Sequence, residues 1–399
     1  MRIAVIGTGI AGLGAAYALS RAHDVELFER EDRPGGHTNT ILHDRLALDT
    51  GFIVHNRPNY PGLVRLFEEL GVATQPSEMS FSVSCARHRI EYAGRRPLGH
   101  APLRLVREIV RFLREARGTI ESAHEQTVGA YVTDHGYSAQ FRDHFLVPLT
   151  AAIWSSGTGS ALDFPAGYAL GFFDNHGMLG FRRKRWRTVV GGSCAYVQAL
   201  LERSGATVHL GLPVRSVTRD DAGVDVVTDD GESRRFDGVV VAVHGDQALP
   251  LLADPSEDEQ RILSAFRSTA SETVLHTDER LLPAKGARAS WNYRLADCGS
   301  ANGHPTITYY LNRLQRLETD RHYCVTLNRS DEIAEERVIR RIAYEHPLYT
   351  FESLRAQAEL PRLNGPRRTA FAGAWQGFGF HEDGLASGLR AASAFGVDW

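Results

Sequence analysis

The stretch Ile3–Leu19, IAVIGTGIAGLGAAYAL, decides the fold of the chain. Its apolar character alone fits either the core of a signal peptide or the start of a nucleotide-binding fold. Gly7, Gly9 and Gly12 favour the second, because they form G-x-G-x-x-G between a strand-like and a helix-like run. In such a unit the first glycine makes a tight turn, the second admits a pyrophosphate, and the third lets helix and strand pack closely. We therefore expect a nucleotide-binding turn here and not a signal peptide.

The next expected strand ends in an acidic residue at the spacing that this motif needs. Val25–Phe28 is apolar, and Glu29 follows it 22 residues after Gly7. An acidic side chain at this point binds ribose hydroxyls in dinucleotide-binding folds. A solvated glutamate at a strand end is the plain alternative, and the spacing favours the nucleotide interpretation.

Composition and charge bound the class of protein. The 399 residues suffice for two domains, and 43% hydrophobic with 23% charged residues is ordinary for a globular protein. The formal net charge of −3 provides no basic field, so no nucleic-acid partner is expected. The four cysteines are widely spaced, which predicts small buried hydrophobes in a reducing, cytoplasmic compartment.

Turn signals and periodicity divide the rest of the chain into blocks. Residues 59–70 are predicted to form a helix that Gly71 ends, and 103–117 a helix that carries five arginines. Ser256 and Glu259 form a capping box at another helix start. A helical block is also expected at 334–363. The predicted strands are a meander at 214–236, a buried parallel strand at 237–243, and four more at 273–279, 289–296, 306–315 and 322–328.

Motifs along nearly the whole chain resemble the superfamily of FAD-dependent amine oxidases and phytoene desaturases. They are the N-terminal glycine motif, an E-x-x-x-R-x-G-G doublet ending at Gly36, central V-V-G-G and D-x-V-V-V-A stretches, and terminal F-A-G-A and E-D-G-L-x-S-G-L-x-x-A stretches. More narrowly, DTGFIVHN at 49–56, AIWSS at 152–156 and GFHEDG at 379–384 resemble a bacterial subgroup of predicted NAD/FAD-binding proteins. That subgroup is associated with cyclopropane-fatty-acyl synthase-type methyltransferases.

The resemblance implies an α/β fold with a Rossmann-like, doubly wound FAD-binding domain that is discontinuous in sequence. An α+β substrate domain, made of a helical part and an antiparallel sheet, would be interleaved with it. We assign the FAD-binding domain to 1–58, 187–250 and 365–399, and the substrate domain to 59–186 and 251–364.

The resemblance also implies FAD as cofactor. The terminal segment would start a helix facing the flavin, with Glu382 or Asp383 contacting the ribityl chain, and Val214 would meet the adenine. His37 stands where amine oxidases commonly have arginine, and we expect it to bond a phosphate or the flavin. The terminal motif contains no cysteine for a covalent link, so noncovalent FAD is predicted. The predicted cofactor-binding residues are Gly7, Gly9, Ile10, Ala11, Gly12, Glu29, Arg30, Gly35, Gly36, His37, Thr38, Val214, Gly373, His381, Glu382, Asp383, Gly384 and Leu385.

Three residues are predicted as catalytic candidates, and no metal site is expected. His176 lies in a glycine-rich loop, where it could act as acid or base or hold the loop by hydrogen bonds. Tyr309 would lie on a strand flooring the substrate cavity. Trp375 could flank the flavin or pack the core. Only Lys184 and Lys285 are available for the lysine that many amine oxidases place at flavin N5, which disfavours amine oxidation.

The expected function is removal of a hydride from an apolar substrate at flavin N5. Our first choice is desaturation or oxidation of a methylated, unsaturated fatty acyl chain. A flavin amine oxidase or carotenoid-type desaturase, and a non-catalytic flavin-binding partner of a fatty-acyl methyltransferase, stay open as alternatives. Expected partners are a small-molecule or lipid substrate, such a methyltransferase, and a membrane surface met by 103–117 and by FRRKRWR at 181–187. The oligomeric state is left open.

Overall fold

A five-stranded parallel sheet holds the N-terminal glycine motif. In the computed structural model, which describes residues 1–93, 100–154, 158–180, 184–295 and 306–399, three distant parts of the chain build this sheet. Strand β14 (Gly238–Val241) is wholly apolar and buried, as expected for a parallel strand covered on both faces. The order of strands is β10 (Thr207–His209), β2 (Asp24–Phe28), β1 (Arg2–Ile6), β14 (Gly238–Val241) and β20 (Thr369–Phe371).

Three helices pack together beside this sheet. Helix α1 (Ile10–Leu19) is buried at all ten positions, which suits an alanine-rich helix that is apolar all round. It contacts α14 (His381–Ser393) and α9 (Cys194–Ser204). The predicted meander is a three-stranded antiparallel sheet whose Val217 and Phe236 share a core with Val239. Its strands are β11 (Val214–Arg219), β12 (Val224–Thr228) and β13 (Ser233–Phe236).

A seven-stranded sheet forms the second large layer. All neighbouring strands pair antiparallel except β16 and β7, which are parallel. The four predicted strands are all present in it, joined by two strands from the first quarter of the chain. The order is β19 (Val338–Leu348), β15 (Arg267–His276), β18 (Cys324–Leu327), β17 (Thr306–Tyr310), β16 (Trp291–Leu295), β7 (Phe81–Cys85) and β8 (Ile90–Ala93).

The predicted helical block at 334–363 is wrong for most of its length. Strand β19 occupies Val338–Leu348 and pairs with β15 along its whole length, and only α13 (Phe351–Glu359) is an α-helix. Ten residues of β15 pair with β19, and the hydrogen bonds of this pairing outweigh the weak helical periodicity of the segment. Pro347 was the signal against a helix, because proline in a helix interior removes a hydrogen bond and clashes with the preceding turn.

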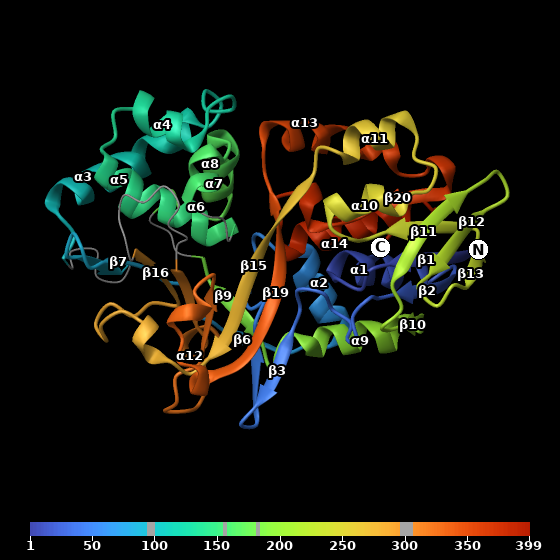
Figure 1. Cartoon of the computed structure of the whole chain (residues 1–399), viewed down its shortest axis with the longest axis horizontal. Coiled ribbons are helices and arrows are strands. Elements are labelled where there is room, and N and C mark those ends of the chain that lie inside the picture. Colours follow the sequence, from blue (N-terminus) through green and yellow to red (C-terminus); the bar gives the residue numbers. More distant parts are fainter. Residues whose placement is uncertain (94–99, 155–157, 181–183, 296–305) are drawn as a thin grey trace.

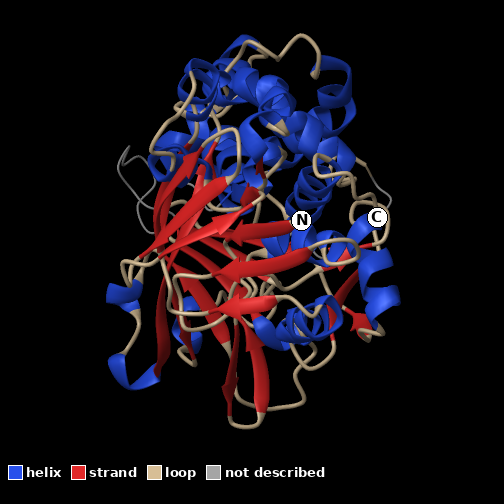
Figure 2. Ribbon diagram, turned by 90° about the vertical axis from the view of Figure 1, so that its right-hand side faces the viewer, coloured by secondary structure: helices blue, strands red, loops and turns tan. Residues whose placement is uncertain are grey.

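The helical part of the chain covers one end of the seven-stranded sheet, as Figures 1 and 2 show. Figure 1 places β15 and β19 between this part and the parallel sheet. Its core is shared with the sheet, since Phe112 and Phe173 belong to the same cluster as Val83 and Tyr293. Its helices are α3 (Leu103–Glu115), α4 (Val128–Asp134), α5 (Ala139–Phe141), α6 (Val147–Trp154), α7 (Thr158–Asp163) and α8 (Ala166–Asn175).

Shorter elements connect these layers. Helix α2 is followed by Gly71 at φ 71°, and α11 begins with the predicted capping box of Ser256 and Glu259. Among the described helices, none is long and apolar enough to cross a membrane. The connecting elements are α2 (Pro61–Leu70), α10 (Gly245–Leu251), α11 (Glu257–Leu263), α12 (Leu311–Leu314), β3 (Thr40–His43), β4 (Leu46–Asp49), β5 (His55–Asn56), β6 (Thr74–Pro76) and β9 (Trp186–Val189).

The cysteines do not all behave as predicted. Cys194 and Cys324 are free, and Cys324 is buried, as expected for small hydrophobes. Cys85 is buried as predicted, but it is disulfide-bonded, so the expectation that it is reduced is wrong. Cys298 lies outside the described residues.

Candidate cofactor site

The turn after β1 has the geometry of a phosphate-binding loop. Gly7 has φ 100°, and a Cβ there would lie 2.5 Å from the carbonyl oxygen of Ala242. A Cβ on Gly12 would lie 1.9 Å from the oxygen of Gly7, so the helix sits directly on the turn. A Cβ on Gly9 would meet nothing within 4 Å, and no side chain caps α1 at this residue. The start of α1 is therefore open to an anion, which its N–H groups and dipole favour.

The acidic residue after β2 is tied to this loop. Glu29 is buried, and its Oε2 accepts hydrogen bonds from the Thr8 N–H (3.0 Å) and the Thr8 hydroxyl (2.5 Å). Its backbone carbonyl accepts from the Leu212 N–H at 2.9 Å, two residues before Val214. Glu29 and the start of β11 thus lie side by side, as an adenosine site requires. Arg30 is exposed next to them. Contacts of Glu29 with ribose and of Val214 with adenine stay predictions.

The glycine doublet at 35–36 packs against the same loop. The Gly35 N–H donates to the Thr8 carbonyl at 3.1 Å, and Gly35 and Gly36 have φ values of 112° and 56°. A Cβ on Gly36 would lie 3.1 Å from the Cα of Gly9. The doublet therefore brings His37 and Thr38 beside the open end of α1.

The terminal motif places a second helix start beside the first. A Cβ on Gly388 would lie 2.1 Å from the Ala11 oxygen, and one on Gly384 would lie 2.7 Å from Ile10. Leu385 is buried and contacts Gly14 in the same interface. The predicted cofactor residues Ile10, Ala11, Gly384 and Leu385 thus pack α1 against α14, while their backbone lies at the two helix starts.

The two acidic side chains of the terminal motif bind the protein's own backbone. Glu382 accepts hydrogen bonds from the N–H groups of Gly62 (2.7 Å) and Leu63 (2.9 Å), and it thereby caps α2. Asp383 accepts from the Phe380 N–H at 2.9 Å. Burial raises the pKa of Asp383 to about 6 and also raises the pKa of Glu382. Contact of either carboxylate with a ribityl chain stays a prediction.

His381 joins a buried polar network at the start of α14. Its Nε2 lies 2.9 Å from the Thr38 hydroxyl and 3.2 Å from the Tyr196 hydroxyl, and its ring stacks on Phe52 at 3.8 Å between centroids. Burial lowers the pKa of His381 to about 3, helped by nearby His55, so the ring is neutral near pH 7. Tyr196 and Phe52 were missed by the sequence analysis, because ordinary aromatic residues in apolar runs carry no signal.

The predicted catalytic residues lie in separate places. Trp375 is buried, its indole N–H donates to the Val243 carbonyl at 3.0 Å, and its ring packs on Phe266. Gly373 makes room for it, since a Cβ there would lie 2.0 Å from the indole nitrogen. These contacts give Trp375 a packing role and argue against its prediction as catalytic. Tyr309 lies on β17, edge-on to Trp291 at 5.1 Å.

His176 ends α8 and is enclosed by aromatic rings. It stacks on Phe172 at 3.8 Å, and its Nδ1 lies 3.2 Å from the Phe172 carbonyl oxygen. Burial lowers its pKa to about 4. The structure favours the interpretation that His176 holds its loop by hydrogen bonds.

An aromatic wall stands where the terminal loop meets α6 and α8. Two hydrogen bonds attach the loop: the Tyr168 hydroxyl donates to the Gly377 carbonyl at 2.7 Å, and the Trp154 indole N–H donates to the Phe378 carbonyl at 3.0 Å. Ring centroids lie 4.6 Å apart for Tyr168 and Phe378. The aromatic wall consists of Trp154, Phe164, Tyr168, Phe172, Tyr349, Phe378 and Phe380.

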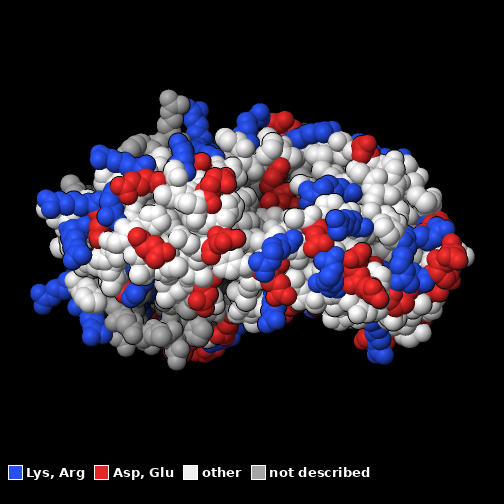
Figure 3. Space-filling model, turned by 90° about the horizontal axis from the view of Figure 1, so that it is seen from above, with Lys and Arg blue, Asp and Glu red and all other residues white. Residues whose placement is uncertain are grey.

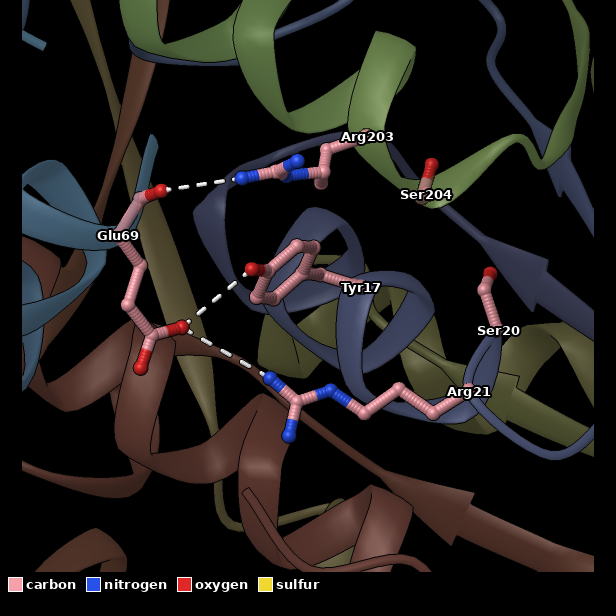
Figure 4. Close-up of a pocket in the computed structure, with 6 residues that line it drawn as sticks. All are labelled: Tyr17, Ser20, Arg21, Glu69, Arg203 and Ser204. Carbon is pink, nitrogen blue, oxygen red and sulfur yellow. Dashed lines mark hydrogen bonds and ion pairs between the residues drawn. The ribbon is translucent and has the colours of Figure 1, made fainter. Parts of the chain in front are cut away.

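A crevice of 460 Å³ lies at the far end of α1 (Figure 4). Glu69 crosses it, and its carboxylate contacts the Tyr17 hydroxyl at 3.3 Å and the Arg21 guanidinium at 3.7 Å. Because Tyr17 lies in the last turn of α1 and Arg21 just after its end, the crevice is separated from the phosphate loop by the length of that helix. The crevice is therefore a different place from the cofactor site.

The residues present at the cofactor site fit FAD. The Gly7–Gly9 turn and the uncapped start of α1 would hold a pyrophosphate, and Glu29 would face a ribose. The start of α14 lies beside α1, so a second helix N-terminus would be available to the flavin. Buried polar atoms near His381 are also available to a ligand. The Nδ1 of His55 and the Nδ2 of Asn56 lack a hydrogen-bond partner among the described residues.

A family model described as flavin containing amine oxidoreductase matches residues 10–308. The chain belongs to this family. The membership confirms the predicted superfamily and, with it, FAD as the cofactor. One relative is the "Putative flavin-containing monoamine oxidase AofH" of Mycobacterium tuberculosis, 27% identical over 279 residues. That match covers 63% of this chain and 59% of the relative, less than two thirds of its length.

Solved structures of other proteins share the fold. Putrescine oxidase bound to putrescine superposes with a TM-score of 0.74 at 17% identity, and 99% of each chain is covered. The CLA-producing fatty acid isomerase from P. acnes superposes with a TM-score of 0.72 at 18% identity, covering 97% of this chain and 96% of that chain. These similarities confirm the α/β architecture with a Rossmann-like FAD-binding part.

Proposed function

We propose that the chain is an FAD-dependent oxidoreductase that removes a hydride from an apolar substrate. FAD supplies the hydride acceptor, flavin N5, when it is bound. The part left to the chain is to position the substrate and to exclude water. The aromatic wall carries the proposal, because it is built on the loop that leads directly into His381 and Glu382.

The wall is apolar and firmly held. Phe172 and Phe380 are stacked at 4.7 Å, and Tyr168 lies 5.1 Å from Tyr349. Phe378 is only partly buried, so an apolar chain could lie against its ring. A surface of this kind excludes water from a long hydrocarbon chain. The shape of the surface, and not a polar contact, then sets the orientation of the chain.

The proposed substrate is a methylated, unsaturated fatty acyl chain, which would be desaturated or oxidised. Neither lysine is placed for the role that many amine oxidases give a lysine at flavin N5. Lys184 donates to Asn59 Oδ1 at 2.6 Å and also to the Asn175 carbonyl, and Lys285 is exposed. The fold shared with a fatty acid isomerase adds support for an acyl chain.

An amine oxidase is the second candidate. The faces of Tyr168 and Phe378 could hold an ammonium group by cation–π attraction. The names of the monoamine oxidase relative and of putrescine oxidase favour this candidate. A carotenoid-type desaturase would use the same apolar wall.

A methyltransferase partner and a membrane surface remain proposals for the arginine-bearing helix α3. Its arginines are partly neutralised, because Arg104 lies 4.0 Å from Glu108 and Arg111 lies 3.7 Å from Glu115. Figure 3 shows basic and acidic side chains interspersed over the face of the molecule that it draws. Of the predicted motifs, 181–183 in FRRKRWR and 155–156 in AIWSS lie outside the described residues.

The test is the absorbance spectrum of the purified protein under anaerobic conditions. A flavin band near ~450 nm that bleaches with methylated unsaturated acyl lipid supports the proposal, and bleaching with putrescine or cyclohexylamine instead supports the amine oxidase. Phe378→Asp should slow bleaching by lipid about 100-fold, because a carboxylate in the wall must be desolvated. Leu42→Asp adds the same charge on an exposed hairpin and should change nothing. An unreduced flavin with a co-purifying methyltransferase would favour the non-catalytic partner.

A further inference from the structure

Three histidines from distant parts of the chain meet beside the phosphate loop. His37 follows the glycine doublet, His244 precedes α10, and His346 lies on β19. The His37 ring centroid is 5.4 Å from that of His346 and 5.6 Å from that of His244, and Tyr344 stacks on His37 at 4.8 Å. We call His37, His244 and His346 the histidine cluster.

The cluster is attached to the loop from both sides. His37 is next to Gly36, where a Cβ would lie 3.1 Å from the Gly9 Cα. His244 comes two residues after Ala242, whose carbonyl oxygen would lie 2.5 Å from a Cβ on Gly7. The imidazoles of His37 and His244 therefore lie on either side of the open end of α1, and His346 reaches them from β19.

The imidazoles are neutral near pH 7 in this structure. Burial lowers the pKa of His346 to about 4, and burial together with His346 and His244 lowers that of His37 well below its usual range. Burial also lowers the pKa of His244. The Nδ1 of His346 is buried and has no hydrogen-bond partner within the described part of the chain. The cluster thus contains an unused polar atom.

Other charged groups face the cluster from the elements around it. Arg33 and His381 act on His37 and lower its pKa, and Arg30 acts on His244 in the same direction. Glu345 and Asp246 raise the pKa of His244. Glu345 also accepts a hydrogen bond from Gln247 Nε2 at 2.7 Å, and Asp246 accepts one from the Ser268 hydroxyl at 2.8 Å.

We propose that the histidine cluster binds the diphosphate of FAD and takes up a proton as it does so. The inference rests on FAD binding as proposed above. The diphosphate diester keeps its negative charge throughout the neutral range, and a nearby negative charge stabilises an imidazolium. One proton is expected, because a second imidazolium within 6 Å is repelled by the first. An arginine at position 37 would bind the same anion without a proton change, because it stays charged.

The sign of the pH dependence follows from linkage. The pKa of the proton-accepting imidazole is low in the free protein and raised in the complex. FAD affinity therefore increases as pH falls below the pKa of the complex, by up to about tenfold per pH unit. Above that pKa the affinity becomes constant.

The experiment measures FAD dissociation constants by flavin fluorescence from about pH 6 to about pH 8.5, a range in which histidines titrate. Calorimetry in two buffers of different ionisation enthalpy then counts the protons taken up. ADP-ribose, which carries the diphosphate diester without the flavin, should show the same slope as FAD. Riboflavin, which lacks the phosphates, should show none.

Variants locate the proton. His37→Arg should keep FAD affinity and abolish its pH dependence, and His346→Gln should reduce the proton count while leaving the fold intact. His124→Gln is the control, because that side chain is 60% exposed in the helical part. A pH-independent FAD affinity in the wild-type chain would overturn the inference, as would an unchanged slope in both variants. Absence of FAD binding at every pH would instead contradict the proposed function.

Discussion

The starts of α1 and α14 lie side by side, yet only α14 has acidic side chains in its first turn. At α1, Gly9 provides no side-chain cap, and a Cβ there would meet nothing within 4 Å. At α14, Asp383 binds the Phe380 N–H, and the neighbouring Glu382 reaches across to cap α2. Neither start has a side-chain cap on its own N–H groups, but at α14 the two carboxylates are already used by the protein.

A ligand is expected to bind where polar groups are not already used by the protein. Unpaired N–H groups at a helix start favour an anion, so the α1 end is the place for the pyrophosphate. Carboxylates already bonded to backbone N–H groups stabilise the fold first. Four substitutions test this difference between the two helix starts.

The largest effect is expected for Gly12→Ala. A Cβ would lie 1.9 Å from the Gly7 oxygen, so α1 must move away from the turn. We expect the free energy of unfolding to fall by about 3 kcal/mol or more and FAD binding to be lost. Urea unfolding measures the change. Gly171→Ala, on α8 with open space around it, is the matched control and should be neutral or stabilising.

A pH-dependent effect is expected for Asp383→Asn. The pKa of Asp383 is about 6 in the folded chain, above its ordinary value of 3.8, so folding favours the protonated carboxyl. As pH rises from about 4 to about 6, the wild type should lose about 2 to 3 kcal/mol of stability relative to the variant. Unfolding curves measured across this range test it. Parallel curves for the two proteins would show that Asp383 ionises without penalty.

Gly9→Ala should separate stability from binding. Because the added methyl group has free space in the protein and φ is −62°, stability should change by less than about 1 kcal/mol. The methyl group would stand where the pyrophosphate is expected, so the FAD dissociation constant should rise about 10- to 100-fold. Fluorescence titration measures it, and unchanged affinity would mean that the anion does not approach Gly9.

The smallest effect is expected for Glu382→Gln. The amide keeps one acceptor oxygen for the N–H groups of Gly62 and Leu63, so stability should fall by about 1 kcal/mol. FAD affinity should stay the same if capping α2 is the role of this carboxylate. A tenfold loss of affinity would instead restore Glu382 as a ribityl contact.

Much of the fold was readable locally. The glycine spacing, the apolar strands and Gly71 act through neighbours in sequence, and the structure confirms the elements that they predicted. The strand at Val338–Leu348 was missed because its partner β15 lies some 70 residues away, and pairing over such a distance has no local signature. The role of Trp375 was left open for a similar reason, since an aromatic residue in a glycine-rich loop is compatible with either a site or a core, and its observed contacts favour the core.

The glycine spacing alone predicts the nucleotide-binding turn, because a Cβ on Gly7 or Gly12 would collide with a backbone oxygen and only glycine avoids this. The sequence motifs also identified the superfamily to which the chain belongs. Tertiary structure alone decided which polar groups are free. Glu382 is used by α2, 320 residues away in sequence, whereas His37, His244 and His346 are brought together from three separate elements. Side-chain partners depend on packing between distant segments, so only the folded chain shows which residues are left for a ligand.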